Sequence, residues 1–91
     1  MYWGKETSTR LTSSAQVSDH HVRVIRVVVE AVGGAVGYVK LYDNTSATGT
    51  PAWQIAVPAE GGWTRQFIIE QDFVTGVYAE LSNAYITLTY A

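Results

Sequence analysis

The chain has 91 residues, a net charge of −2 and no cysteine, so neither disulfides nor thiolate metal sites are available to it. One small domain is expected at this length, and its stability must come from packing or from oligomerisation. Its six lysines and arginines form no basic run and no apolar stretch approaches a membrane helix of ~20 residues, so neither nucleic acid nor membrane is an expected partner.

Residues 1–19 differ in composition from the rest of the chain. They are polar and rich in serine and threonine, with Tyr2 and Trp3 at the far end. Because such a segment cannot bury enough apolar area to order itself, we predict an extended arm that docks on a neighbouring subunit through these two aromatic side chains. The alternatives are a frayed terminus and an additional short strand near residues 11–17.

Residues 21–32 form the strongest predicted strand. Ile25, Val27, Val29 and Ala31 share one face by the two-residue period, while Val22, Val24 and Val28 share the other face with Arg26 and Glu30. A strand with valine on both faces is either central or covered on its second face by the arm or by a partner. We therefore expect Val22, Val24 and Arg26 to contact another protein.

Five further strands are expected, each separated by turn-forming residues. They cover residues 36–43, 52–57, 63–70, 77–81 and 84–90, with turns at Gly33-Gly34, within 43–51 and 58–62, and at 71–72 and 82–83. The predicted inward-facing side chains are Val39, Leu41, Val77, Ala79, Leu81, Ile86, Leu88 and Tyr90. Two further sets are each expected to share a face of their strand: Trp53, Ile55 and Val57, and Trp63, Phe67 and Ile69.

No segment has sustained helical periodicity, and the strands follow one another about every ten residues. This pattern predicts an all-β protein, a small antiparallel β-sandwich of jelly-roll or immunoglobulin-like type with about 6–8 strands. We divide the chain into an N-terminal arm, residues 1–19, and a sandwich domain, residues 20–91. Apolar residues make up 47% of the chain, which we expect to exceed what a lone copy can bury.

Catalytic and metal-binding patterns are weak. Asp19-His20-His21 is the only histidine cluster, and neighbouring histidines on a strand point to opposite faces, which disfavours a shared metal ion. The serines lie in polar loops without a nucleophile elbow. The chain is therefore not expected to be an enzyme or to hold a metal or cofactor.

Exposed aromatic side chains leave one alternative of a different class. Tyrosines on the outward faces of strands form flat platforms for sugar rings in β-sandwich carbohydrate modules, whereas packing or protein contact would use the same residues differently. The candidates are Tyr38, Tyr42, Tyr78 and Tyr85, with one or more of Trp3, Trp53 and Trp63.

Three segments carry a resemblance to a known group of proteins. They are Val22–Val29, Val39–Thr50, which contains LYDNTSATGT, and Gly76–Leu81, whose sequence is GVYAEL. Over roughly residues 20–91 the chain resembles small virion structural proteins of tailed bacteriophages. The resemblance implies a β-sandwich subunit built into the particle, with the capsid, tail, baseplate and fibre all open as its location.

Of these locations, a capsid decoration or cement role suits the composition best. Such a protein would be made in the host cytoplasm, assemble into a homo-oligomer such as a trimer, bind the major capsid protein on the capsid surface and stabilise the head by protein–protein contacts. A tail, baseplate or fibre module is the first alternative, and a carbohydrate-binding or adhesin sandwich is the second.

Overall fold

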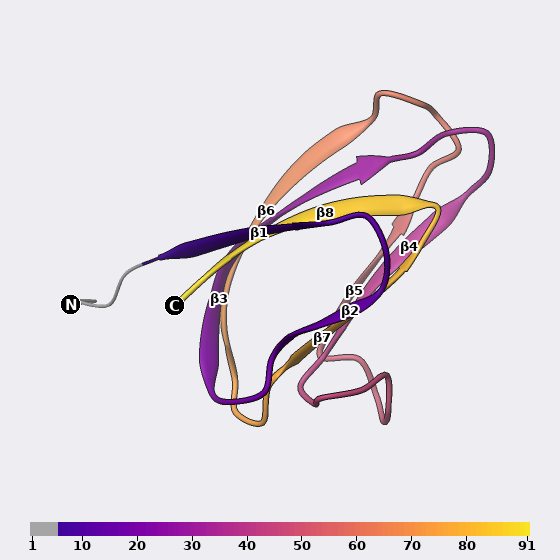
Figure 1. Ribbon diagram of the computed structural model, residues 1–91. Helices are drawn as coiled ribbons and strands as arrows, with labels where there is room; N and C mark the ends of the chain where they lie inside the picture. Colours follow the sequence, from indigo (N-terminus) through magenta and orange to yellow (C-terminus); the bar gives the residue numbers. More distant parts are fainter. Residues whose placement is uncertain (1–5) are drawn as a thin grey trace.

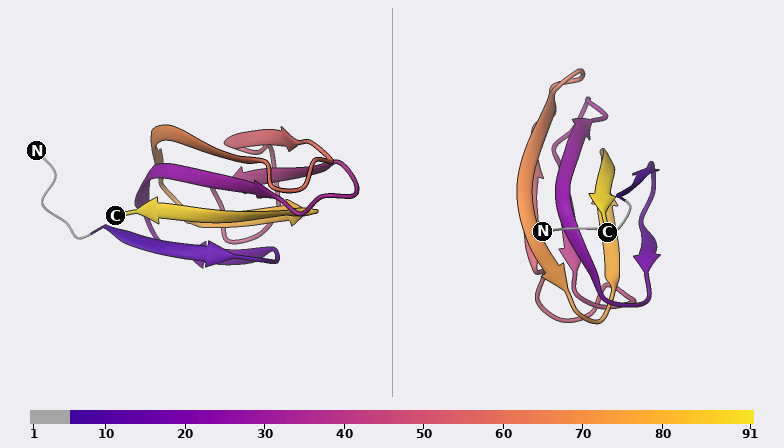
Figure 2. Two further views of the ribbon diagram at one scale, coloured as in Figure 1. Left: turned by 90° about the horizontal axis from the view of Figure 1, so that it is seen from above. Right: turned by 90° about the vertical axis from the view of Figure 1, so that its left-hand side faces the viewer.

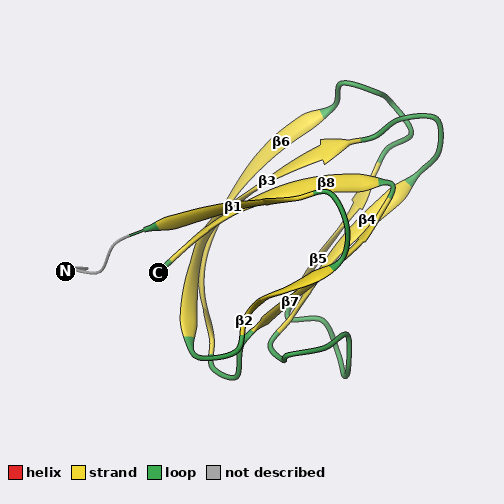
Figure 3. Ribbon diagram, in the orientation of Figure 1, coloured by secondary structure: helices red, strands yellow, loops and turns green. Residues whose placement is uncertain are grey.

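The computed structural model describes residues 6–91, which form eight β-strands and no helix (Figures 1 and 3). The same residues therefore contain no helix capable of crossing a membrane. The strands are β1 (Thr7–Leu11), β2 (Ala15–Ser18), β3 (Val22–Ala31), β4 (Gly37–Tyr42), β5 (Trp53–Val57), β6 (Thr64–Phe73), β7 (Val77–Ser82) and β8 (Ala84–Tyr90).

Two four-stranded antiparallel sheets pack face to face (Figure 2). One has the order β1-β8-β3-β6 and the other the order β2-β7-β4-β5, so every connection except that between β4 and β5 passes from one sheet to the other. This arrangement of eight strands is that of a jelly roll. The prediction of a small all-β sandwich is confirmed, and of the two expected types it is the jelly roll.

The N-terminal boundary of the sandwich lies earlier than expected. Residues 7–11 pair with β8 as an edge strand, and residues 15–18 pair with β7 in the other sheet. The expected arm over residues 1–19 is therefore wrong for these two segments, and the expected strand near residues 11–17 is two strands with a turn between them. Serine and threonine suit an edge strand of a sandwich, because both its outer face and its unpaired edge meet solvent.

Strand β3 changes the face on which its apolar side chains point. The pairing register with both neighbouring strands shifts between Val24 and Arg26, so a β-bulge interrupts the alternation at Ile25. Val22 and Val24 before the bulge and Val27 and Val29 after it all point into the core. The valines that seemed to occupy two faces therefore occupy one, and the expectation that Val22 and Val24 lie on the outer face is wrong.

The register shift continues into the neighbouring strand β6. Val24 pairs with Gln71 of β6 and Val27 pairs with Phe67, so β6 uses one residue more than β3 over this stretch. On the other side the same two valines pair with Tyr90 and Leu88 of β8, so β8 uses one residue fewer. Glu70 on β6 has a positive φ of 43°, which accommodates the additional residue. The turn expected at residues 71–72 is consequently absent, and β6 runs on to Phe73, whose ring is fully buried.

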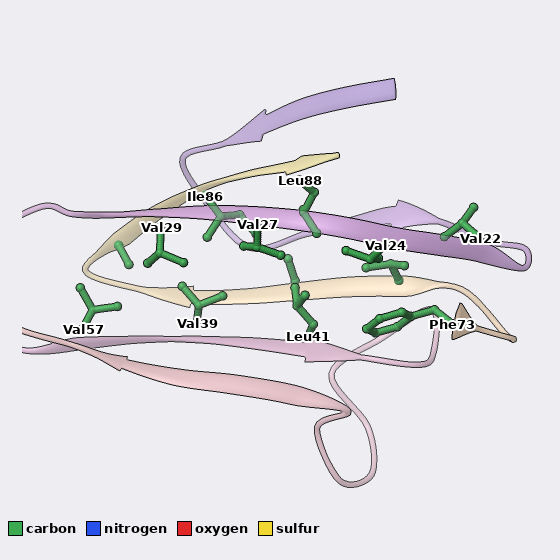
Figure 4. Packing of buried hydrophobic residues seen from close by; sticks show 13 residues of the cluster. Val22, Val24, Val27, Val29, Val39, Leu41, Val57, Phe73, Ile86 and Leu88 are labelled. Carbon is green, nitrogen blue, oxygen red and sulfur yellow. The ribbon is translucent and has the colours of Figure 1, made fainter. Parts of the chain in front are cut away.

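The core fills the space between the two sheets (Figure 4). Strands β3, β6 and β8 contribute from one side, and β4, β5 and β7 contribute from the other. Its largest fully buried side chains are Phe73, Leu41, Ile86, Leu88, Val24, Val27, Val29, Val39, Val57 and Val77. All of the predicted inward-facing residues are confirmed as core or as packed against it, and the half-buried Trp53, Trp63 and Phe67 also pack against the core.

The bulge in β3 can be tested by comparing two valines of that strand. Val24 is completely buried, whereas Val28 is half-buried on the outer face. We expect Val24→Ala to lower the free energy of unfolding by about 2 kcal/mol, through lost burial and the cavity left behind, and Val28→Ala to cost clearly less. Urea denaturation of both variants measures the difference, and equal losses would contradict the assignment of Val24 to the core.

Gly37 opens β4 where the chain passes closest to the turn before β8. A Cβ atom at this position would overlap the carbonyl oxygen of Ser82 and come within 2.8 Å of that of Asn83, both of which belong to the backbone. Asn83 itself, with a positive φ of 49°, donates from its side-chain amide to the carbonyl oxygen of Ala35. A side chain at position 37 would therefore force the β4–β7 pairing apart.

We expect Gly37→Ala to destabilise the fold by more than about 1 kcal/mol, because backbone atoms cannot move aside as a flexible side chain can. Gly61→Ala is the matched control, since a Cβ atom there meets only ordinary contacts at 3.9 Å. Thermal unfolding of the two variants compares them directly. A Gly37→Ala protein as stable as Gly61→Ala would show that β4 and the turn at Ser82 are less closely packed than described.

Candidate functional site

The outer face of the sheet β2-β7-β4-β5 carries a cluster of polar and aromatic side chains around one carboxylate. Tyr38, Lys40 and Tyr42 alternate along β4 with the core residues Val39 and Leu41. The antiparallel register places Glu80 of β7 directly opposite Lys40 and therefore between the two tyrosines. We call Tyr38, Lys40, Tyr42 and Glu80 the tyrosine–glutamate cluster.

Both oxygens of the Glu80 carboxylate accept a tyrosine hydroxyl. The Tyr42 hydroxyl donates to Oε1 at 2.7 Å and the Tyr38 hydroxyl donates to Oε2 at 3.0 Å. The Lys40 ammonium lies 4.7 Å from the centre of the Tyr38 ring, in cation–π contact. The three side chains of β4 are thus fixed around a single residue of the neighbouring strand.

These bonds shift the titration of all three ionisable oxygen groups in the cluster. The hydroxyl of Tyr42, and then that of Tyr38, stabilises the carboxylate and lowers the pKa of Glu80 below its ordinary value of 4.5. The same hydrogen bonds to Glu80 raise the pKa of both tyrosines above 10.0, because removing their protons would set two negative charges side by side. At neutral pH the cluster therefore holds one carboxylate and two neutral phenols.

This geometry bears on the sugar-platform alternative. Tyr42 was expected to face outward into solvent, but only 6% of its surface is exposed. Lys40 lies over the ring of Tyr38, and both hydroxyls are already bonded to Glu80. A stacking platform needs a free ring face, so the contacts within this cluster disfavour the use of Tyr38 and Tyr42 as a sugar platform.

The outer face of the other sheet carries a second group of charged residues. The guanidinium of Arg10 on β1 forms an ion pair with Glu30 on β3 at 2.9 Å and lies 5.1 Å from the centre of the Tyr85 ring. The guanidinium of Arg26 lies 3.4 Å from the carboxylate of Glu6. Such exposed pairs contribute little to stability, but they order the side chains that a partner would meet.

The structure separates the five predicted contact residues into three groups. Tyr2 and Trp3 lie outside the described residues. Val22 and Val24 are 4% and 0% exposed and belong to the core, because the bulge at Ile25 turns them inward. Arg26 does lie on the outer face, and its contact with another protein stays a prediction.

Four large apolar side chains are exposed among residues 6–91, three of them in connections and one in a strand. They are Val32, Val36, Ile68 and Val74. The sandwich therefore buries more of its apolar side chains than the composition indicated, because the core valines of β3 all point between the two sheets.

The histidine segment lies in the turn between β2 and β3. His20 donates through Nδ1 to Asp19 at 3.0 Å, a bond that lowers the pKa of that carboxyl. His21 lies near Asp72 instead, with 3.5 Å between Nε2 of the histidine and Oδ1 of the aspartate. Among the described residues no three potential ligands come together as a metal site, and no ligand-sized cavity is found there.

Two features of the outer faces were not predicted from the sequence. They are Glu80 as the acceptor of two tyrosine hydroxyls on one face and the exposed Ile68 on the other. The alternation of Tyr38, Lys40 and Tyr42 indicated a polar face. The partner of that face depends on the β4–β7 register, which alternation alone does not define.

Comparisons with protein-family models, with curated proteins and with solved structures find no match to this chain.

The tyrosine–glutamate cluster predicts a pH dependence of stability. Because the Glu80 pKa is lower in the folded protein than in the unfolded chain, its contribution is present above the ordinary value of 4.5 and is lost as the pH falls through the lowered, folded-state pKa. We expect wild type to be more stable than Glu80→Gln at pH 7 and this advantage to shrink below pH 4.5. Urea denaturation of both proteins at several pH values measures it.

Glu60→Gln is the matched control, because it removes one carboxylate from the exposed β5–β6 connection. Its stability should follow that of wild type at pH 7. A difference between wild type and Glu80→Gln that is the same at every pH would show that the hydrogen bonds to Glu80 do not depend on its charge.

Proposed function

We propose that this chain is a structural protein of a tailed-bacteriophage virion, a capsid decoration or cement protein that stabilises the head by protein–protein contacts. The observation that carries the proposal is the jelly-roll strand order, an architecture used in viral capsid domains, found in a chain whose strands resemble those of small virion proteins. The step from fold to function is an analogy, because one fold serves many functions.

The physical properties of the sandwich support a mechanical role. Its core is packed from both sheets, and the tyrosine–glutamate cluster holds the side chains of one outer face in place by hydrogen bonds. A surface whose side chains are ordered before binding loses less conformational entropy when it docks. Two such outer faces let one small domain contact two neighbours at once.

Assembly on a lattice makes modest contacts sufficient. A contact of ~800 Å² on each partner has a large gross hydrophobic term at ~25 cal/mol per Å², most of which is offset by the cost of association. Many copies arranged symmetrically on a closed shell add their small surpluses. We infer a homo-oligomer and the major capsid protein as partners, and the capsid surface as the location.

The competing functions use the same fold at other places. A tail, baseplate or fibre module would need the same rigid sandwich and differs only in its neighbours. The alternative of a carbohydrate-binding or adhesin module (a lectin-type function) is also compatible with a jelly roll. The tyrosine–glutamate cluster disfavours it on this face, since Tyr42 is buried and Lys40 covers Tyr38.

The proposal is tested by locating the protein in particles of the phage that encodes it. We expect electron cryomicroscopy of wild-type particles and of particles lacking this gene to differ by density at capsomer junctions. Heads without the protein should also release their DNA at a lower temperature. Difference density confined to the tail, or particles without this protein, would overturn the decoration role, and saturable binding on a glycan array lost in Tyr38→Ala or Tyr42→Ala would favour the lectin alternative.

A further inference from the structure

Four strands lie at the margins of the two sheets and leave one edge of hydrogen-bonding groups unpaired by the described residues. Three of these strands are short: β1 and β5 have five residues each and β2 has four, and β5 is also bracketed by Pro51 and Pro58. Short strands and prolines are common ways of protecting a sheet edge from unwanted pairing. β6 is different, because it has ten residues, no proline and no lysine (Figure 2).

The middle of β6 also carries an unusual apolar side chain. Ile68 is 59% exposed and lies on the outer face of its sheet, opposite Arg26 of β3. Its neighbours Phe67 and Ile69 point inward but are only half-buried, and the Phe67 ring meets Trp53 edge-on with 5.4 Å between ring centres. Apolar surface is therefore present on both sides of the free edge.

The charges of β6 are arranged so that the strand is complementary to itself. Arg65 lies near its beginning, and Glu70 and Asp72 lie near its end. Among the described residues neither Arg65 nor Glu70 has an ion-pair partner, whereas Asp72 already lies 3.5 Å from Arg23 and from His21. When two such strands run antiparallel, the positive end of each lies beside the negative end of the other.

From these observations we propose that two copies of the chain associate through β6, edge to edge and antiparallel, about a two-fold axis at Ile68. A two-fold axis between antiparallel strands passes through a residue paired with itself, so the next pairs are Phe67 with Ile69 and Gln66 with Glu70. The exposed Ile68 side chains then meet on the outer face. The β1-β8-β3-β6 sheet of one copy and the same sheet of the second copy then form one continuous sheet.

The left-handed backbone at Glu70 limits this joint ladder. The pairing of β6 with β3 is regular from Thr64 to Ile68 and shifts beyond it, so the ladder extends little past Gln66 and Glu70. A short ladder gives a weak, concentration-dependent dimer in solution. The β6 dimer takes from the proposed function only the expectation that the chain forms a homo-oligomer. It adds the surface through which the copies contact each other and the symmetry that relates them.

Self-association is measured on the purified full-length chain by sedimentation over a range of concentrations. We expect wild type to move from monomer to dimer, and Ile68→Lys to raise the dissociation constant by about tenfold or more, because lysine at a sheet edge opposes pairing. Val36→Lys is the matched control, since Val36 is 76% exposed in the β3–β4 connection, and it should behave as wild type.

The absence of cysteine from the sequence permits a direct test of the axis. Under mild oxidation Ile68→Cys should give a disulfide-linked dimer, because residues paired across a ladder lie within the Cα separation that a disulfide spans, whereas Val36→Cys should not. Arg65→Glu should weaken the dimer, because it places a further negative charge beside the end of the second strand that carries Glu70 and Asp72.

A wild-type chain that stays monomeric throughout, or equal behaviour of the substitutions at positions 68 and 36, would overturn the proposal. These measurements use no virus particle, so they fail or succeed separately from the proposed location on a head. A protein that decorates heads as a monomer would retain the proposed function and lose the β6 dimer, while a β6 dimer absent from particles would do the reverse.

Discussion

The fold depends on a single interruption in its central strand. β3 pairs with β8 on one side and with β6 on the other, and it supplies four fully or nearly fully buried valines to the core. Without the bulge at Ile25, strict alternation would turn either Val22 and Val24 or Val27 and Val29 outward. The bulge keeps both pairs inside, and the register shifts that accompany it give β6 its longer path and its irregular backbone at Glu70.

The polar side chains on the two outer faces of the sandwich are held in place by different contacts. On the face with the tyrosine–glutamate cluster, one carboxylate organises two phenols and is itself opposite a lysine. On the other face, Arg10 bridges β1 and β3 by its bond to Glu30 while resting on Tyr85. Glu80 thus joins two side chains of the neighbouring strand, whereas Arg10 reaches over β8 to the next strand but one, so that few charges cover a wide area.

Alternation and turn chemistry were sufficient to predict most of the fold. The strands from β4 to β8 were predicted with nearly correct bounds, apart from the end of β6, and inward residues such as Leu41, Ala79 and Leu88 are confirmed. The bulge was missed because a period of two, applied without interruption, makes Val22 and Val24 appear to face away from Val27. β1 was missed, and β2 was anticipated only as an alternative strand near residues 11–17, because short polar edge strands lack the apolar alternation on which the prediction relied.

The site was harder to predict, since it forms between strands that are distant in sequence. Tyr38 and Tyr42 indicated a polar face, but their attachment to Glu80 follows from the β4–β7 register, which local sequence does not specify. The same holds for Ile68. Its exposure depends on β6 being a margin of the sheet, and strand order is a property of the whole topology.

The pairing of the first described strand with the last has a kinetic consequence. Thr7 of β1 lies opposite Tyr90 of β8, and all but one of the connections cross between the sheets, so almost every contact joins distant parts of the chain. Loop-closure entropy opposes such contacts until many of them form together, which places folding on the order of milliseconds to seconds. During synthesis, β8 must therefore leave the ribosome before this sandwich can close.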